Sequence, residues 1–562
     1  MDGAGLSRIP MRQVWTWLTE IVGPDSRYFW LAIVYGIAIS LLSLATPISV
    51  QLLINSVANT ALPTPLFTLA GILFLLLALV GVLSAFRVQL MALFERRVFA
   101  RVVAEITIRA VHAQNPFFAD ARRVDLFNRY FDLMTVQKSV PSLLIGGFTI
   151  ILQSAVGLVV TSFYHPFFLA FNVVLVLLVL IVWQVWAPRA IPTAVALSHA
   201  KHNAAHWLES VGGSNGFYKS SRHLDFAMDR SEEVTAAYVK RHRAHFRYSF
   251  AQTIAFLFLY AAASATLLAL GGWLIIGGQL SIGQLVAAEL ILSGVFYGIS
   301  QLGWYLDTFY DLVASSEELS LLYGIPQEAW PEREGERPSS GLVRLRDVVH
   351  DGAQFHFQLE PGVQLVTVAT DGADRVLGPL LKRHVTPERG LVSVGGADLG
   401  ALDMYLLRSE IMVIERPTIV EVSIREYLRL ARPDVTAGEM LDVLADVGLD
   451  ERIAQLPDGL DTGLASSGWP LSISEVMALK LANAALSRPR VLMLSQLYDL
   501  LAPERIRTVL DRLRISGTTV LLVTERPEAM MLDGYLLLGC KVQQRFTTLA
   551  ELKAGMAEAA RA

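Results

Sequence analysis

The chain has 562 residues, of which 53% are hydrophobic and 17% are charged. This length suits two or more domains, and the composition is too apolar for an ordinary soluble protein, so it predicts a membrane-embedded part beside a soluble part. The net charge of −4 implies no polyanion partner, and we therefore expect no nucleic-acid binding. The single cysteine, Cys540, excludes a disulfide framework and most cysteine metal sites.

Residues 1–27 are predicted to form an amphipathic N-terminal segment. Met1–Asp25 carries charges and tryptophans rather than a short apolar run followed by small residues, so we expect no cleavable signal peptide. Within this segment Val14 and Trp15 lie beside Arg12, a pattern that suits a helix lying along the inner leaflet of a membrane.

Three long intervals of the chain contain no Asp, Glu, Lys or Arg. They are Leu31–Phe86, Pro141–Pro188 and Tyr248–Ala288. A membrane-spanning helix needs about 20 apolar residues, so each interval is long enough for two. The sequence therefore predicts six spans within residues 28–323, at roughly 28–55, 65–90, 141–164, 166–187, 249–277 and 282–306.

The charged connectors give the orientation of these spans. Residues 91–139 hold eight Lys and Arg, and residues 188–247 hold nine, whereas the connectors inside the apolar intervals are short and uncharged. By the positive-inside rule the two basic segments are cytoplasmic, and six spans place both termini there as well. We expect an integral membrane protein, in a bacterial inner membrane.

The helices are expected to continue well beyond the membrane. Over Met91–Val111 apolar residues recur at helical spacing, with charges on the opposite face. Two short cytoplasmic helices are predicted at 115–125, where Pro116 breaks the preceding helix, and at 210–222, where glycines permit a reversal. The alternative is that both are ordinary helix breaks in a solvent-exposed loop.

A linker at residues 324–340, rich in Pro, Glu, Arg and Ser, precedes a second domain at 341–562. In this domain short apolar strands alternate with helical stretches, which argues for an α/β fold with a largely parallel core sheet. The strands are expected at Leu365–Ala369, Ile411–Ile414, Val491–Leu494 and Thr519–Thr524.

Six segments of this second domain, in this order, resemble the motifs of the nucleotide-binding domain of ABC transporters. They are Ala369–Val376, Val413–Pro417, Leu471–Glu475, Val491–Gln496, Leu500–Ala502 and Val523–Arg526. With the six spans before it, the chain resembles an exporter-type ABC half-transporter. The resemblance implies an α-helical membrane domain with long cytoplasmic extensions, followed by an α/β nucleotide-binding-type domain.

The resemblance also implies an ATP site, but this chain departs from the family at the phosphate loop, Ala369–Val376, which includes Gly372. Arg375 stands where the family has lysine, Val376 replaces the hydroxyl that holds magnesium, and Asp374 replaces a glycine whose amide faces phosphate. A carboxylate about 4 Å from a phosphate charge costs roughly 4 kcal/mol at an effective dielectric constant near 20. Alternatively, Asp374 pairs with Arg375 and fills the site with the protein's own charges.

The other motifs have lost their polar residues in the same way. Glu415 or Arg416 stands at the family's glutamine, both signature glycines are gone although a serine remains, and the two carboxylates and the switch histidine are replaced. The remaining positions of this degenerate site are Ser472, Ser474, Glu475, Ser495, Gln496 and Glu525.

These substitutions predict no catalytic residue and little or no ATP hydrolysis. We expect no bound cofactor, with weak magnesium-independent ATP binding left open. The expected partners are the lipid bilayer and a second ABC half-transporter, as a homodimer or heterodimer. One hypothesis is a non-hydrolysing subunit of a dimeric transporter. The alternative is a pseudo-ATPase scaffold or regulator that acts without transport.

Two further groups of residues are candidate sites in the first domain. His199, His202 and His206 share one helix face and could bind a metal, or they could be solvated histidines on an exposed helix. Glu289 is the one carboxylate inside a predicted span. It faces a membrane cavity or a partner helix, or it lies near the edge of the membrane.

Overall fold

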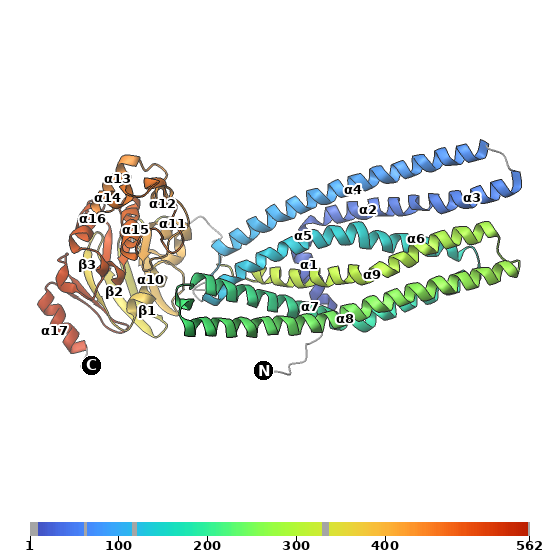
Figure 1. The fold of residues 1–562 in the computed structure, drawn as a ribbon. Coiled ribbons are helices and arrows are strands. Elements are labelled where there is room, and N and C mark those ends of the chain that lie inside the picture. The colour runs from blue at the N-terminus through green and yellow to red at the C-terminus, as the bar shows by residue number, and fades with distance from the viewer. Residues whose placement is uncertain (1–8, 61–63, 115–120, 329–335, 560–562) are drawn as a thin grey trace. The chain divides into compact units, whose positions relative to one another are not determined.

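The computed structural model describes residues 9–60, 64–114, 121–328 and 336–559. These residues belong to two compact units (Figure 1). Among these residues, the membrane unit contains 9–60, 64–113 and 121–328, and the C-terminal unit contains 114 and 336–559. The predicted linker at 324–340 falls partly on residues 329–335, which lie outside the described residues.

The membrane unit consists of long helices that lie beside one another (Figure 1). Among the described residues, six helical stretches are long and apolar enough to cross a membrane, which confirms the predicted number. The elements are α1 (Met11–Val22), η1 (Gly23–Asp25), α2 (Ser26–Ser43), α3 (Ala45–Thr60), α4 (Thr64–Val111), η3 (Ala121–Phe131), α5 (Asp132–Ser142), η4 (Leu143–Gly147), α6 (Phe148–Ser162), α7 (Pro166–Gly213), η5 (Phe217–Lys219), α8 (Ser221–Ile276) and α9 (Ile282–Tyr323).

The apolar stripe at the C-terminal end of α4 forms a core, as its spacing predicts. Phe94, Val98 and Val102 are fully buried, and Ile106 is nearly so. They pack with buried residues of α5 and of the last turns of α9. Because residues four apart lie on one face of a helix, this stripe holds α4 against its neighbours well beyond the predicted span.

The helices at the first and third predicted spans have other bounds than the spans themselves. The first span is not one helix, because α2 ends at Ser43 and α3 begins at Ala45. Pro47 lacks the N–H that would donate to the carbonyl of Ser43, so a continuous helix loses a hydrogen bond at this point. At the third span the chain is already helical at Asp132 and Pro141 lies inside α5, so helical structure begins before the predicted span.

The predicted reversal at 210–222 is present, but not for the expected reason. Helix α7 ends at Gly213, η5 follows, and α8 begins at Ser221. Gly212, Gly213 and Gly216 are not among the residues with positive φ, and Gly216 has a φ of −60°. The turn therefore needs no conformation that is special to glycine. Of the other predicted segment, at 115–125, residues 115–120 lie outside the described residues.

The C-terminal unit contains two sheets. A six-stranded sheet has the order β10-β9-β3-β8-β7-β6 with parallel pairing from β9 to β6, which confirms the predicted parallel core, and a four-stranded antiparallel sheet has the order β2-β1-β4-β5. The strands are β1 (Val343–His350), β2 (Ala353–Leu359), β3 (Gln364–Ala369), β4 (Arg389–Val394), β5 (Ala397–Asp398), β6 (Ile411–Ile414), β7 (Val491–Leu494), β8 (Thr519–Val523), β9 (Tyr535–Leu538) and β10 (Gln543–Phe546).

Helices cover the parallel sheet, whose central strands are buried on both faces as such strands usually are. The helices are α10 (Ala373–Leu381), η6 (Leu399–Ala401), α11 (Met404–Glu410), α12 (Ile424–Arg429), α13 (Ala437–Asp446), α14 (Asp450–Ala454), η7 (Gly459–Asp461), α15 (Ile473–Ser487), η8 (Gln496–Leu500), α16 (Pro503–Ile515), η9 (Pro527–Ala529) and α17 (Leu549–Ala559).

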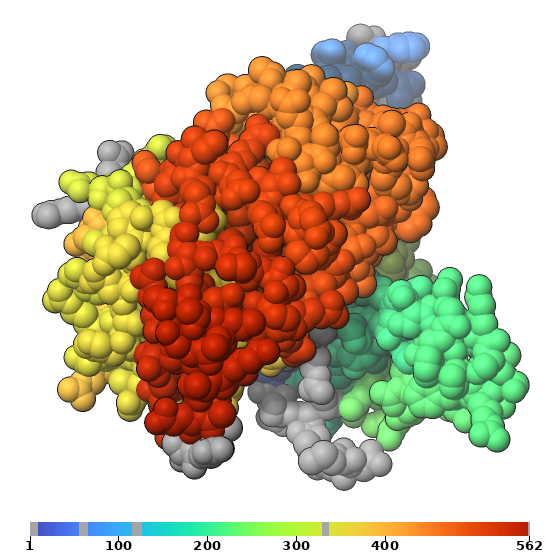
Figure 2. Space-filling model, turned by 90° about the vertical axis from the view of Figure 1, so that its left-hand side faces the viewer, coloured from blue at the N-terminus to red at the C-terminus, as the bar shows by residue number. Residues whose placement is uncertain are grey.

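The two sheets meet where β10 lies beside β2. The side chain of Gln543 accepts a hydrogen bond from the amide of His356 at 3.0 Å and donates one to the carbonyl of Gln354 at 2.9 Å. Figure 2 shows the same neighbourhood at the surface, with the red C-terminal residues beside the yellow residues of the first strands. Contacts between the second strand and the last strand therefore join the two sheets of this unit.

Two glycines of the antiparallel sheet provide a matched test of packing. Gly390 (φ +91°) faces a bulge of β1, where an added Cβ would collide with the backbone of Asp347, whereas Gly396 (φ +87°) has open space around it. Both alanine variants carry the strain of a left-handed residue, and only Gly390→Ala adds a backbone collision. We expect Gly390→Ala to destabilise the protein by roughly 2 kcal/mol more than Gly396→Ala, measured by thermal unfolding. Equal losses would contradict this.

Candidate functional site

A polar cavity of about 390 Å³ lies at the carboxyl ends of β3 and β8. In parallel α/β sheets, ligands bind at this edge of the strands. The structure brings six of the predicted site residues together there, with four neighbours. The lining residues are Val368, Ala369, Asp371, Gly372, Asp374, Arg375, Gln496, Val523, Thr524 and Glu525.

Several backbone amides of the loop that follows β3 already donate hydrogen bonds to carbonyls of the protein itself. The amide of Thr370 donates to the carbonyl of Leu538 at 2.9 Å, that of Ala373 to Thr370 at 3.1 Å, and that of Arg375 to Gly372 at 3.0 Å. A phosphate-binding loop works by pointing free amides at the anion. These three amides have backbone acceptors instead.

The charges that line the cavity are mainly negative. Asp371, Asp374 and Glu525 contribute carboxylates, and Arg375 contributes the one guanidinium of the lining. The alternative pairing of Asp374 with Arg375 was wrong, because the ion pairs within 4.0 Å among the described residues do not include these two. Val376 does not line the cavity, and its side chain packs against an apolar cluster of the unit.

The residues after β7 serve local structure. The Ser495 hydroxyl accepts a hydrogen bond from the amide of Leu497 at 3.4 Å at the start of η8, while Gln496 offers a neutral amide to the cavity. A carboxylate that sequence reasoning missed, Asp499, accepts hydrogen bonds from the hydroxyl of Thr524 at 2.5 Å and from the amide of Glu525 at 3.0 Å. Asp499 follows β7, and its two partners follow β8. They meet because β7 and β8 are neighbours in the sheet, and the sequence does not reveal this strand order.

Ser472 and Glu475 form the N-terminal cap of α15 and do not line the cavity. The carboxylate of Glu475 accepts from the amide of Ser472 at 2.7 Å, and the hydroxyl of Ser472 accepts from the amide of Glu475 at 3.4 Å. Glu475 also pairs with Arg452 at 3.2 Å, and Ser474 lies 3.2 Å from Ser472 through their hydroxyls. The spacing S-x-x-E is that of a capping box, a signal that the sequence contained.

Glu415 lies just after β6, near two lysines that sequence reasoning also missed. Burial lowers the pKa of Lys382 and of Lys480, neighbouring cations lower each pKa further, and Glu415 opposes the shift in both. The Lys480 ammonium donates to the carbonyl of Arg416 at 2.7 Å. This cluster fixes the segment after β6 and is separate from the lining of the cavity.

Replacing Lys382 with methionine should stabilise the protein near neutral pH. The pKa of Lys382 is lower in the folded state, so the unfolded state binds the proton more tightly. The charged side chain therefore lowers the free energy of unfolding. This loss is full below the folded-state pKa and disappears as the pH rises toward 10.5. We expect a thermal midpoint about 2 °C higher at pH 7 and a smaller gain at pH 10. Exposed Lys541→Met should change little. A gain that is independent of pH would contradict the assignment.

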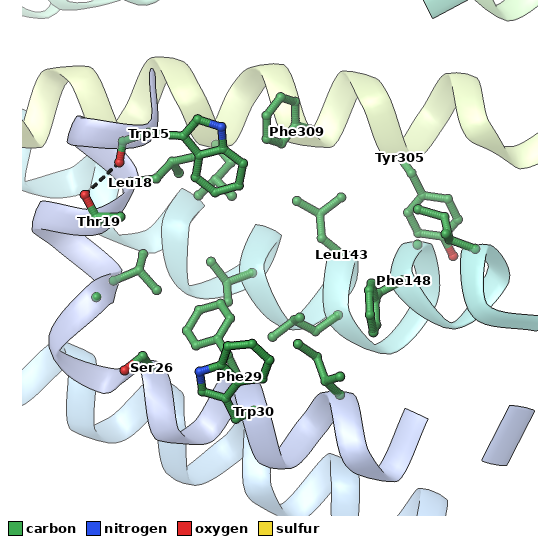
Figure 3. A pocket seen from close by; sticks show the side chains of 18 of the residues that line it. Trp15, Leu18, Thr19, Ser26, Phe29, Trp30, Leu143, Phe148, Tyr305 and Phe309 are labelled. Carbon is green, nitrogen blue, oxygen red and sulfur yellow. Dashed lines mark hydrogen bonds between the residues drawn. The ribbon is translucent and has the colours of Figure 1, made fainter. Parts of the chain in front are cut away.

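The membrane unit contains a second cavity, of about 780 Å³, which sequence analysis did not predict (Figure 3). Aromatic and aliphatic side chains of α1, α2, α6 and α9 line it, including Trp15, Phe29, Phe148 and Phe309. Tyr305 packs against Gly147 beside a π-helical turn. Such a lining suits an apolar ligand.

Glu289 does not line this cavity. It lies exposed on α9, about 10 Å along the helix from its first residue, and accepts a hydrogen bond from the hydroxyl of Ser293 at 3.1 Å.

The three predicted histidines do not act as one set. His199 and His202 approach carboxylates of α5 and α9, whereas His206 is exposed and is not in the cluster of His199, Glu317 and Glu318.

No protein-family model matches the chain. Over 533 residues, 91% of this chain and 74% of the other, it is 23% identical to the leukotoxin translocation ATP-binding protein LktB of Mannheimia glucosida. It is 25% identical over 268 residues to the cyclolysin secretion/processing ATP-binding protein CyaB of Bordetella pertussis, where the match spans 46% of this chain and 38% of that protein. A third match, 31% identical over 178 residues, is to the mitochondrial potassium channel ATP-binding subunit of Xenopus tropicalis, and it spans 26% of that protein.

Among solved structures, the chain is similar to a bacterial Atm1-family ABC exporter with ATP bound. The TM-score is 0.77 at 17% sequence identity, and the match covers 94% of this chain and 96% of the other. The similarity therefore extends over both units and is a similarity of fold.

Proposed function

We propose that this chain is the non-hydrolysing subunit of a dimeric transporter. The premise is that it has the fold of an ABC exporter half-transporter, which is a membrane domain fused to a nucleotide-binding domain. In this proposal the chain shapes the membrane pathway while a second half-transporter hydrolyses ATP.

The main support for this proposal is the negative charge of the cavity that Glu525 helps to line. Three carboxylates face a position where the fold would place phosphate, and the loop amides of Thr370, Ala373 and Arg375 already have acceptors. Hydrolysis also needs a hydroxyl that holds magnesium and a carboxylate that orients water, but Val376 and Gln496 stand at those two positions. One guanidinium is a weak substitute for this set.

The test measures ATP turnover and binding of a labelled ATP analogue, with and without magnesium, on the purified full chain in lipid nanodiscs. We expect no magnesium-dependent binding and no turnover above that of the Arg375→Ala variant. That variant is the control for contaminating ATPases, because a contaminant is unaffected by it. Turnover typical of such transporters that disappears in Arg375→Ala would refute the proposal.

The cap on α15 favours a second candidate function, a pseudo-ATPase scaffold or regulator that acts as a homodimer or on another membrane protein. In the family, the signature of one chain faces the nucleotide of its partner, but here the Glu475 carboxylate occupies the start of that helix. Co-purification with an intact half-transporter supports the subunit. Isolation as a homodimer without a companion supports the scaffold.

The proposed location is a bacterial inner membrane with both termini in the cytoplasm, which follows from the basic connectors at 91–139 and 188–247. Reporter fusions to each terminus test this orientation, and activity of a periplasmic reporter at either end would contradict it.

A further inference from the structure

A cluster of histidine and carboxylate side chains joins α7 to the last turns of α9 in the membrane unit. The Nε2 atom of His199 lies 3.0 Å from Oε2 of Glu317 and 3.8 Å from Oε1 of Glu318. One ligand atom from each of these three residues lies within 4.8 Å of the other two. Ligands that share a zinc ion at 2.0–2.2 Å are separated by about 3–4 Å.

The carboxylate of Glu318 gives this cluster a second, independent feature. Its side chain is fully buried. Its Oε2 atom contacts Arg129, and neither of its carboxylate oxygens has a hydrogen bond among the described residues. The other oxygen, Oε1, lies 3.8 Å from Nε2 of His199 and 3.9 Å from Nε2 of His202. A buried carboxylate oxygen without a hydrogen bond is costly, and two imidazoles flank this one at distances too long for hydrogen bonds.

Carboxylates outnumber the permanent cations in and around this cluster. Asp132 pairs with Lys201 at 2.7 Å and with His202 at 2.5 Å, and its Oδ1 accepts a hydrogen bond from Ser315. Three carboxylates, Asp132, Glu317 and Glu318, therefore face two permanent cations, Arg129 and Lys201. This negative charge favours a bound cation.

We propose that His199, Glu317 and Glu318 bind a divalent transition-metal ion, with His202 as the nearest further donor. Imidazole together with carboxylate suits zinc or manganese, whereas magnesium and calcium prefer sites built from oxygen alone. The ion reaches the site from solvent, because the side chain of His199 is 47% exposed and that of Glu317 is 13% exposed. Once bound, it fastens the end of α9, which stops at Tyr323, to α7.

The test is calorimetric titration of the chelator-stripped full chain, purified without a histidine tag, with zinc, manganese and magnesium chlorides. We expect one zinc ion per chain, and His199→Gln and Glu317→Gln should each weaken its binding at least tenfold. Both residues are partly exposed, so these variants should fold, unlike variants of Glu318, which would leave Arg129 buried without its partner.

The matched control is His356→Gln, which removes an exposed histidine that is also paired with a carboxylate, Asp347, at 2.9 Å. It should bind zinc as the unchanged chain does. Zinc should also raise the thermal midpoint of the unchanged chain but not that of His199→Gln. No saturable zinc binding, binding unaffected by His199→Gln and Glu317→Gln, or equal binding of magnesium would each overturn the proposal. None of these outcomes depends on ATP turnover.

Discussion

Replacing Asp25 with alanine should destabilise the membrane unit by about 3–5 kcal/mol. Asp25 lies in η1, between α1 and α2, and is 1% exposed. Its two carboxylate oxygens accept hydrogen bonds from the Nε atoms of Arg97 at 2.7 Å and Arg101 at 2.9 Å, both on α4. Removing one partner of a buried ion pair leaves the other charge desolvated, which costs far more than the intact pair contributes.

The arginines would keep only part of their interactions. Arg101 also donates to the carbonyl of Ile21 and pairs with Glu105 of its own helix, and its side chain is only 16% exposed. Arg97 is about half exposed and can turn toward solvent. We therefore expect Arg101 to account for most of the loss, and Asp25→Ala with Arg101→Met to be more stable than Asp25→Ala alone.

Thermal unfolding of the detergent-purified chain measures this loss. Exposed Asp225→Ala on α8 is the control, because it also removes one carboxylate from a helical region of the same unit. An Asp25→Ala midpoint within the error of the Asp225→Ala midpoint would contradict the assigned role.

The six spans could be predicted because a helix that crosses a lipid bilayer needs a long run of residues without charge, and such runs are easy to recognise in this sequence. The break at Leu44 could not be predicted, because a proline such as Pro47 allows either a kinked helix or two separate helices. The packing of the neighbouring helices decides between the two. The buried Arg87 was missed for the same reason. Its guanidinium donates to the hydroxyl of Thr149 on α6 at 2.5 Å, a partner that only the packing of α4 against α6 reveals.

In the C-terminal unit, local patterns predicted four of the ten described strands closely, and β6 and β7 have the predicted bounds. Six of the predicted site positions line one cavity because each follows a strand or starts a helix at the same edge of the sheet. Local sequence could have shown that Ser472 and Glu475 form a capping box. It could not have revealed Asp499, because its partners Thr524 and Glu525 are more than 20 residues away along the chain.

Asp374→Asn should raise the affinity of the cavity for a labelled ATP analogue by roughly a hundredfold. A carboxylate about 4 Å from a phosphate charge costs roughly 4 kcal/mol at an effective dielectric constant near 20, and partial exposure of Asp374 reduces this by about a third. The remaining free energy of about 2.7 kcal/mol corresponds to a change of about a hundredfold in the dissociation constant. Asparagine keeps the shape of the side chain, so the change isolates its charge.

Magnesium should not improve this gained binding, and turnover should stay absent, because the Asp374 variant leaves Val376 and Gln496 in place. The control is Asp442→Asn, which removes the same formal charge from an exposed position on α13. If both variants bind equally, then general electrostatics explains the gain and the local repulsion by Asp374 is refuted. If neither binds better than the unchanged chain, then the occupied amides of Thr370, Ala373 and Arg375, rather than charge, decide the affinity of this cavity.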